Sequence, residues 1–473
     1  MLRLQGGQVE CLWDEVLPES LRQLPDDLAQ IDELLRDETL LSPIAAHWDK
    51  EAAERGCSAK EHGRPTIAMQ TYVRLLIVKH RYGWGYETLM REVSDSLHLR
   101  RFCLIGLHER VPDESTIRKL TRRLGAEVVA ELSRLVIGKA QRETRFKARA
   151  VRIDSTVVEA DVRYPTDAGL ARDGVRTLAR VGRSLSAQVG GTRVRVQDRS
   201  RAVGRRLREI TRTLRRRTGQ AKQEVLELTG QTGKLLAASV QEARALASEA
   251  REVAAALARS RTPSQRRTAA SVLRAAERLQ TFVERSQQVV EQIGKRLAGE
   301  PITDRLVSLF DPEARPIRKG KLGRPTEFGY VHQLAEVTPN TKPGARGFLL
   351  PPATKPGNPG ENELLPQTVA ELRRLELAPR EVALDGGFQT KASAETLTPL
   401  APERTFIAGR AAAGSKRTRR RLTRYRVGIE GRISHLKRGR GLRRSRLKGA
   451  EGERTWTGWA IFTHNVETYG AYA

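Results

Sequence analysis

Three carboxylates occupy positions where they could carry chemistry. Asp154 interrupts a β-branched run, Asp385 follows a short apolar run, and Glu430 lies in the most basic part of the chain. Carboxylate oxygens are ligands that Mg²⁺ prefers, and the bound ion keeps water and takes substrate phosphate. Two such ions about 3.5–4 Å apart would activate an attacking oxygen and stabilise a leaving oxygen in phosphodiester displacement. For each acid taken singly, a surface salt bridge is the alternative.

Cations flank Glu430 at helical spacing. In YRVGIEGRISHLK, Arg426 precedes Glu430 by four residues and Lys437 follows it by seven, so all three project from one face of a helix. This spacing places one acidic ligand between two cations that could hold phosphates. A ladder of surface ion pairs is the alternative interpretation.

The residues around the first two acids predict strands. Residues 147–160 alternate β-branched and polar side chains, with Asp154 in the middle. Val382 and Leu384 predict a short buried strand that ends at Asp385. A carboxylate in a β-branched strand is costly to bury, so we expect a positive partner near Asp154. Further strands are predicted at 327–337, 345–351 and 403–409, and a helix at 362–377.

The stretch from about residue 170 to residue 300 has a helical pattern. Apolar residues recur there in steps of three and four, as in heptads. Thr262 as a cap and Pro263 as the first helical residue predict two arms that fold back as an antiparallel coiled-coil hairpin. Residues 201–300 carry 21 basic and 10 acidic side chains. This excess of basic residues has two interpretations. The hairpin contacts DNA, or the basic side chains form a helical face that is only solvated.

The N-terminal part of the chain is predicted to be helical. Short acidic helices are expected in residues 1–60, and the GRPT sequence at 63–66 predicts a helix start with Pro65 in the first turn. Ser115 is the expected N-cap of a later basic helix. Short helices joined by tight turns are typical of a helix-turn-helix-like DNA-binding domain. A helical bundle with a structural role alone fits the same pattern. A C-terminal helix around Trp459 is expected to pack against the core.

Charge is distributed unevenly along the 473 residues. The chain has 85 Lys+Arg and 56 Asp+Glu, a net charge of +29. Residues 1–50 hold 4 basic and 11 acidic side chains, whereas residues 401–450 hold 17 basic and 2 acidic ones. The segments 415–426 and 435–449 are dense enough in cations to neutralise many phosphates, which favours nucleic acid as the partner. An acidic protein or a membrane surface is the alternative.

Other classes of protein are not expected. No stretch approaches ~18 consecutive apolar residues, and the N-terminus lacks a cationic head followed by an apolar run, so neither a membrane span nor a signal peptide is predicted. Cys11, Cys57 and Cys103 lie far apart without a CxxC pair, which argues against a disulfide framework or a cysteine zinc site. We therefore expect a cytoplasmic protein with reduced thiols.

The motifs together resemble those of a bacterial insertion-sequence DDE transposase with a Y-R-E-K-type signature. The first acid lies in RIDSTVVEADVRYPTDAGLARDG (152–174), the second in ALDGGFQ (383–389) and the third in YRVGIEGRISHLKRGRGLRRSRLKG (425–449). The YPTD sequence is similar to chains of the ISNCY-like group. The signature tyrosine of the family would fall at Thr423, and Tyr425 stands nearby instead.

The resemblance implies an α/β fold. An RNase H-like mixed-sheet catalytic core would be interrupted by a long helical coiled-coil insertion and preceded by an all-α N-terminal domain. The implied domains are an acidic helical segment at 1–60, a helical DNA-binding domain at 61–140, the catalytic core at 141–170 and 301–473, and the inserted helices at 171–300.

The resemblance also implies an activity. The protein would bind the terminal inverted repeats of an insertion sequence, cleave the strands at the ends and join the 3′-hydroxyl to target DNA by two-metal phosphodiester transfer. Asp154, Asp385 and Glu430 would be catalytic and would bind two Mg²⁺, with Mn²⁺ as a substitute. The implied DNA-binding residues are Arg426, Lys437, Tyr425, Arg432, Arg438 and Arg440.

The implied partners are double-stranded DNA at the transposon ends and the target, and a second copy of the chain in a homodimeric synaptic complex. The expected location is the bacterial cytoplasm at the nucleoid, without a membrane. Three alternatives remain open: a catalytically silent DNA-binding regulator, an architectural coiled-coil protein, and a Mg²⁺-dependent nuclease that only hydrolyses.

Overall fold

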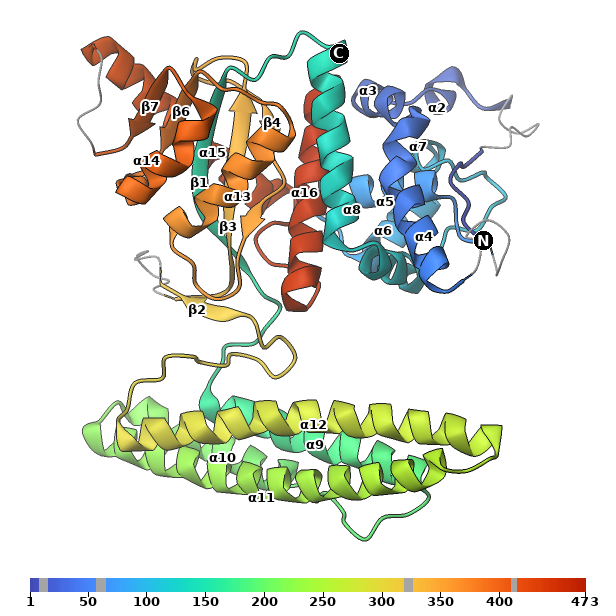
Figure 1. Ribbon diagram of the computed structural model, residues 1–473, viewed down its shortest axis with the longest axis vertical. Helices are drawn as coiled ribbons and strands as arrows, with labels where there is room; N and C mark the ends of the chain where they lie inside the picture. The colour runs from blue at the N-terminus through green and yellow to red at the C-terminus, as the bar shows by residue number, and fades with distance from the viewer. Residues whose placement is uncertain (8–15, 57–64, 319–325, 410–414) are drawn as a thin grey trace. The chain divides into compact units, whose positions relative to one another are not determined.

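The computed structural model describes residues 1–7, 16–56, 65–318, 326–409 and 415–473. The described chain forms two compact units (Figure 1). One comprises Met1–Asp161 together with Ile317–Ala473, and the other comprises Val162–Pro316. The second unit is therefore inserted, in sequence, into the first. None of the described helices is long and apolar enough to cross a bilayer.

Some of the predicted features lie outside the described residues. They are Cys11, Cys57, residues 63–64 of the GRPT sequence, and residues 322–325 ahead of the predicted strand at 327–337. Cys103 is a buried free thiol, and burial raises its pKa to about 12. Such a thiol stays protonated near neutral pH and is chemically inert.

The first unit is built on a mixed sheet with the strand order β2-β3-β1-β6-β7. The long strand β1 (Ala150–Glu159) pairs antiparallel with β3 (Glu327–Thr338) and parallel with β6 (Glu381–Leu384). Beside β6, β7 (Arg404–Ile407) runs parallel to it. The short strands β2 (Arg315–Ile317), β4 (Phe348–Leu349) and β5 (Ala353–Thr354) pair with β3.

The predicted strands are therefore confirmed, with one difference. Residues 345–351 form a strand only at Phe348–Leu349, and the loop that follows contributes the two-residue strand β5. The prolines at 351 and 352 separate these two short strands, because proline has no N–H to donate to a ladder.

Helices cover β1 on both faces, which is why its apolar residues are buried on both. Ile153 packs into a core shared with α13 (Glu361–Arg374), whereas Ala150 packs against α15 (Lys416–Gly439). Val158 also packs against α15, through Ile429 and Leu436. Because side chains alternate along a strand, all even-numbered residues of β1 face α15.

Helix α16 (Gly449–Gly470) joins the sheet to the N-terminal helices (Figure 1). Trp459 is only 1% exposed, and its ring meets Tyr72 edge-on at 5.7 Å. On the sheet side, the Asn465 amide accepts a hydrogen bond from the Leu349 N–H and donates one to the Leu349 carbonyl, both at 2.8 Å. The expected packing of this C-terminal helix against the core is confirmed.

The described helices before the sheet share its core. They are α3 (Asp26–Leu35), α4 (Ser42–Glu54), α5 (Met69–Tyr82), α6 (Tyr86–Asp95), α7 (Leu97–Phe102) and α8 (Glu114–Glu143), whereas the short α2 (Glu19–Arg22) buries no residue. One hydrophobic cluster runs from Leu28 through Leu75 and Val129 to Ile153. The helical layer and the sheet are therefore stabilised together.

Two predicted helix starts are wrong. Helix α5 begins at Met69 and not in the GRPT sequence, because the Thr66 N–H donates to the Met1 carbonyl and the Thr66 hydroxyl accepts the Arg3 N–H. These bonds hold the chain before α5 against the N-terminal segment. Helix α8 begins one residue before Ser115, with Asp113 as its N-cap.

The second unit is a helical bundle. It contains α9 (Asp167–Val189), α10 (Ser200–Thr213), α11 (Gly219–Ala258) and α12 (Pro263–Ala298). Thr262 is the N-cap of α12 and Pro263 its first residue, as predicted. The two long arms, α11 and α12, pack against each other and also against α9. Their apolar stripes are therefore buried in a shared bundle core, which includes Leu178, Leu246 and Val283.

Candidate active site

The sheet register places two of the three acids side by side. Ile153 of β1 pairs with Leu384 of β6 in the parallel ladder, so the next residues along each strand, Asp154 and Asp385, are neighbours. Adjacent strands lie about 4.8 Å apart. Aligned residues on parallel strands point to the same face, and for Asp154 this is the face that α15 covers.

Arg426 joins the second acid to the third. One end of its guanidinium lies 3.3 Å from Asp385, and the other lies 2.7 Å from Glu430. The Arg426 side chain is 13% exposed, whereas the carboxylates of Asp385 and Glu430 are 43% and 53% exposed. The two acids are therefore open to solvent above a largely buried cation.

Asp154 lies deeper than the other two acids. It is half-buried in the middle of β1, and its carboxylate accepts a hydrogen bond from the Ser155 N–H at 2.7 Å. Sequence position, register and the covering helix thus bring the three carboxylates to one face of the sheet.

The carboxylates do not form a closed metal-binding cluster. Among the residues that the structure describes, no group of three or more His, Cys, Asp or Glu side chains is arranged to hold a metal ion. Arg426 supplies the positive charge to Asp385 and Glu430. The donor set itself is all oxygen, which suits a hard divalent cation.

A buried ion-pair network supports this arrangement. Glu336 is fully buried and accepts hydrogen bonds from Arg152 at 2.8 and 2.6 Å. Its other oxygen accepts from Arg432 at 3.0 Å and from the Gly347 N–H at 3.1 Å. Since every oxygen of Glu336 has partners, the burial of this charge is compensated.

Arg152 was missed by sequence reasoning, although a signal for it exists. It stands two residues before Asp154 and therefore points to the same face of β1. Its guanidinium donates to the Tyr425 carbonyl at 3.1 Å and lies 5.1 Å from the centre of the Tyr425 ring. Arg152 thus holds α15 in place over the strand that carries the first acid.

Three of the predicted DNA-binding side chains serve internal contacts. Tyr425 is 1% exposed, its hydroxyl lies 2.6 Å from the Thr338 hydroxyl, and burial raises its pKa. Arg432 is paired with Glu336, and Arg440 is paired with Glu467 and donates to the Arg81 carbonyl. In this structure the interactions of all three stabilise the packing of α15.

The other predicted DNA-binding residues lie differently. Arg426 holds the two acids, and Lys437 is half-buried on the same side of α15 by helical spacing. Arg438 is exposed and donates to the Ser434 hydroxyl at 2.6 Å. Exposed cations that sequence reasoning did not name individually line the first turns of α15 and the segment after it: Lys416, Arg417, Arg420, Arg424, Arg443, Arg444 and Arg446.

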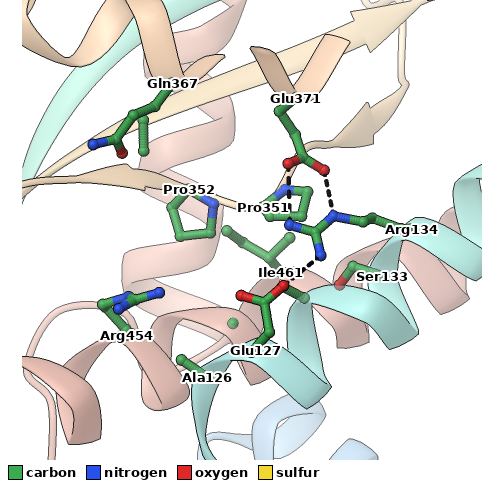
Figure 2. Close-up of a pocket in the computed structure, with 13 residues that line it drawn as sticks. Ala126, Glu127, Ser133, Arg134, Pro351, Pro352, Gln367, Glu371, Arg454 and Ile461 are labelled. Carbon is green, nitrogen blue, oxygen red and sulfur yellow. Dashed lines mark hydrogen bonds and ion pairs between the residues drawn. The ribbon is translucent and has the colours of Figure 1, made fainter. Parts of the chain in front are cut away.

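A separate pocket of about 160 Å³ lies between α8, α13 and α16, and its lining includes none of the three acids (Figure 2). Arg134 projects into it and donates to Glu371 at 2.6 Å and to Glu127 at 2.8 Å. The charge of Arg134 is therefore satisfied within the protein. We assign this pocket no chemistry.

Two basic residues in the first part of α8 are also engaged. Arg118 pairs with Glu114 and lies over the Tyr86 ring, while Arg123 pairs with Glu51. These contacts fit a packing bundle. The helix-turn-helix interpretation of this region stays a prediction.

Comparison with known proteins gives a family match for the N-terminal helices. Residues 22–123, which run from the end of α2 into the first half of α8, match the family described as transposase domain DUF772. No curated protein and no solved structure matches the chain. The match covers the N-terminal helices and stops before the sheet that carries the acids. It supports a transposase family for this protein and, with it, a DNA partner.

Proposed function

We propose that the protein is a DNA transposase of the DDE type. It would bind the terminal inverted repeats of an insertion sequence, cleave the DNA at the ends and join the 3′-hydroxyl to target DNA. The observation that carries the proposal is the alignment of Asp154 and Asp385 on paired strands beneath the helix that bears Glu430. The transposase domain match in residues 22–123 supports it independently.

The catalytic residues of the proposal are Asp154, Asp385 and Glu430. Their oxygens fit Mg²⁺, with Mn²⁺ as a substitute, and two of the three carboxylates are open to solvent. When bound, two divalent ions supply activation of the attacking oxygen and stabilisation of the leaving oxygen. In their absence Arg426 bridges Asp385 and Glu430 and offsets part of their negative charge, which keeps the two acids close together.

Arg426 has a second role in the proposal. Once its carboxylates are otherwise neutralised, its guanidinium is available to a phosphate of the flanking DNA, for which a planar fork of donors is well suited. Lys437 lies on the same side of α15, and Arg438 is exposed nearby. Together with the exposed cations at the start of α15 they would form the grip on DNA next to the site.

The fold supports the same proposal. A mixed sheet with acids on adjacent parallel strands, interrupted in sequence by a helical unit, is what an RNase H-like core with an insertion requires. The domain roles in the proposal are a helical DNA-binding region at 61–140, a catalytic core at 141–170 and 301–473, and inserted helices, in part a coiled coil, at 171–300. The active form would be a homodimer at the bacterial nucleoid.

Strand cleavage tests the catalytic assignment. Purified full-length protein is incubated with Mg²⁺ and duplexes taken from the DNA that flanks its gene on each side. We expect Asp154→Ala, Asp385→Asn and Glu430→Gln to abolish cleavage and to leave end binding nearly unchanged. Glu395→Gln is a matched control, because Glu395 is a largely exposed acid on α14 (Lys391–Leu397) that pairs with the exposed Lys391. Cleavage by the Asp154→Ala variant would remove Asp154 from the site.

A catalytically silent DNA-binding regulator or architectural protein is the second candidate. The observation that favours it is the Arg426 guanidinium between Asp385 and Glu430, together with the lack of a closed metal cluster in the described ranges. This candidate predicts that the wild-type protein binds transposon ends without nicking them. Joined transposon–target products would exclude it, whereas nicks without joined products would indicate a nuclease.

A further inference from the structure

The helical unit at Val162–Pro316 has a groove between two of its helices. The groove has a volume of about 530 Å³ and lies between α9 and α12. Its apolar lining is Val181, Leu185 and Ala275. Polar side chains of two kinds line it as well: the hydroxyls and amide of Ser184, Ser271 and Gln188, and the guanidinium groups of Arg180, Arg274 and Arg278.

The three arginines of this groove lack acidic partners. They are exposed, and no carboxylate of the described chain lies within ion-pair distance of any of them. Two acids of the neighbouring helix α11 are engaged elsewhere. Glu242 pairs with Arg199, and Glu249 accepts the backbone N–H of Arg193. The guanidinium groups of Arg180, Arg274 and Arg278 therefore form no ion pair within the unit.

Positive charge in the unit is concentrated on α9 and α12. Helices α9 and α12 together carry 11 basic and 5 acidic side chains, whereas α11 carries 4 basic and 5 acidic ones. On α9 the arginines recur at Arg172, Arg176, Arg180 and Arg183, which is the spacing of one helical stripe. On α12, Arg267, Arg274 and Arg278 make a second stripe. Of these cations, Arg180, Arg274 and Arg278 line the groove. Arg172 pairs with Asp173, and Arg176 and Arg183 interact electrostatically with Asp198.

We propose that this groove binds the phosphate backbone of double-stranded DNA, so that the inserted unit is itself a DNA-contacting element. Phosphate contacts in protein–DNA complexes come from arginine together with Ser and Gln side chains, and the groove offers this set. Residues four apart on a helix lie about 6 Å apart along its axis, close to the spacing of successive phosphates on one strand. The contacts would be independent of base sequence, since the groove presents charge and hydroxyls.

The inference rests on the proposed function in one respect, which is the choice of DNA as the partner. It assigns DNA contact to the inserted unit, which lies outside the transposase domain match at 22–123. An acidic protein segment is the competing occupant of an arginine groove, and the test below separates the two.

Equilibrium binding of a short duplex of arbitrary sequence to the full-length protein, in EDTA and over a series of salt concentrations, tests the inference. The variant carries Arg180→Gln, Arg274→Gln and Arg278→Gln. Affinity falls as salt rises, and each lost phosphate contact makes the slope of log affinity against log salt shallower by about 0.9. For the three arginines we expect a slope that is shallower by about 2.7 and a loss of affinity of about tenfold or more.

A second triple variant is the matched control. Lys234→Gln, Arg244→Gln and Arg251→Gln remove the same charge from exposed positions of α11. We expect this control to keep nearly the wild-type slope. Replacement of the three groove arginines by lysine should restore most of the slope, and an unchanged circular dichroism melting curve shows that the bundle is intact.

Two results would overturn the inference. One is an equal loss of slope in the groove variant and the α11 control, and the other is equally tight, groove-dependent binding of polyglutamate. The outcome is independent of the proposed activity. If the groove variant has a shallower salt slope but the wild-type protein never cleaves DNA, the groove binds DNA and the transposase proposal is wrong. If cleavage is normal and the salt slope of the groove variant is unchanged, the transposase proposal stands and the groove does not bind DNA.

Discussion

Arg152 and Glu336 stand directly opposite each other on the antiparallel strands β1 and β3, and both are buried. Two nitrogens of Arg152 donate to one oxygen of Glu336, while a third donates to the Tyr425 carbonyl on α15. Arg152 lies two residues before Asp154 on the same face. The pair therefore ties the strand that bears one candidate acid to the helix that bears another.

Loss of one partner of this ion pair should destabilise the protein. Glu336→Gln would leave the guanidinium groups of Arg152 and Arg432 buried with reduced compensation, and we expect a decrease in the free energy of unfolding of about 3–5 kcal/mol. Urea denaturation measures it. The double variant Glu336→Gln with Arg152→Met should lose less than the sum of the single variants, because the two residues interact directly. Additive losses would contradict the coupling.

Gly428 is the point where α15 lies closest to Arg152. A Cβ built at Gly428 would lie 1.8 Å from one terminal nitrogen of Arg152 and 2.7 Å from its Cζ. Alanine normally stabilises a helix relative to glycine. We nevertheless expect Gly428→Ala to destabilise the protein by about 1–3 kcal/mol, because Arg152 is held by Glu336 and cannot move freely.

Gly431, one turn further along α15, provides the control for this substitution. A Cβ at Gly431 would meet nothing within 4 Å, and the residue is exposed. Gly431→Ala should therefore stabilise the protein by up to about 1 kcal/mol. Thermal unfolding of the two variants measures the difference. The same sign for both would show that Gly428 is not a contact point.

Lys79 should make stability depend on pH. It is buried, with its ammonium group 3.8 Å from the centre of the Trp456 ring, and burial lowers its pKa from 10.5 to about 7. Between these values the unfolded chain binds more protons than the folded one, so the free energy of unfolding rises with pH. We expect a gain of about 2 kcal/mol between about pH 7 and pH 9.

The variant Lys79→Met isolates this effect. It removes the titrating group, so the gain of stability over that pH range should disappear. Denaturant unfolding of both proteins at a series of pH values measures it. An identical pH dependence of the two proteins would show that Lys79 is ionised normally in the folded state.

Arg426 should compete with divalent cations for the acids. Arg426→Gln removes the charge that lies beside Asp385 and Glu430, so we expect Mn²⁺, monitored by electron paramagnetic resonance, to bind about threefold to tenfold more tightly. DNA cleavage should fall in the same variant. Arg438→Gln, on the same helix but bonded to Ser434, should leave Mn²⁺ binding unchanged. Weaker Mn²⁺ binding in Arg426→Gln would argue against the site.

Much of the local structure could be predicted from the residues. The β-branched run around Asp154, the apolar pair before Asp385 and the periodic helices on either side of Pro263 all appear where expected. Such patterns are local, because strand and helix periodicity depend on residues only a few positions apart. The start of α5 could not be predicted this way, since it depends on hydrogen bonds from the distant Met1–Arg3 segment.

The sequence by itself determined the types and elements of the candidate site: three acids, two strands and one basic helix. Only the tertiary structure decided which cations face the acids and which are used for packing. Arg432 and Arg440 look like DNA contacts in a basic run, but Glu336 and Glu467 pair with them. Arg180, Arg274 and Arg278 look like ordinary solvated charges, yet they line one groove. The physical reason is that the role of a charge depends on its nearest partners, and folding brings those partners from distant parts of the chain.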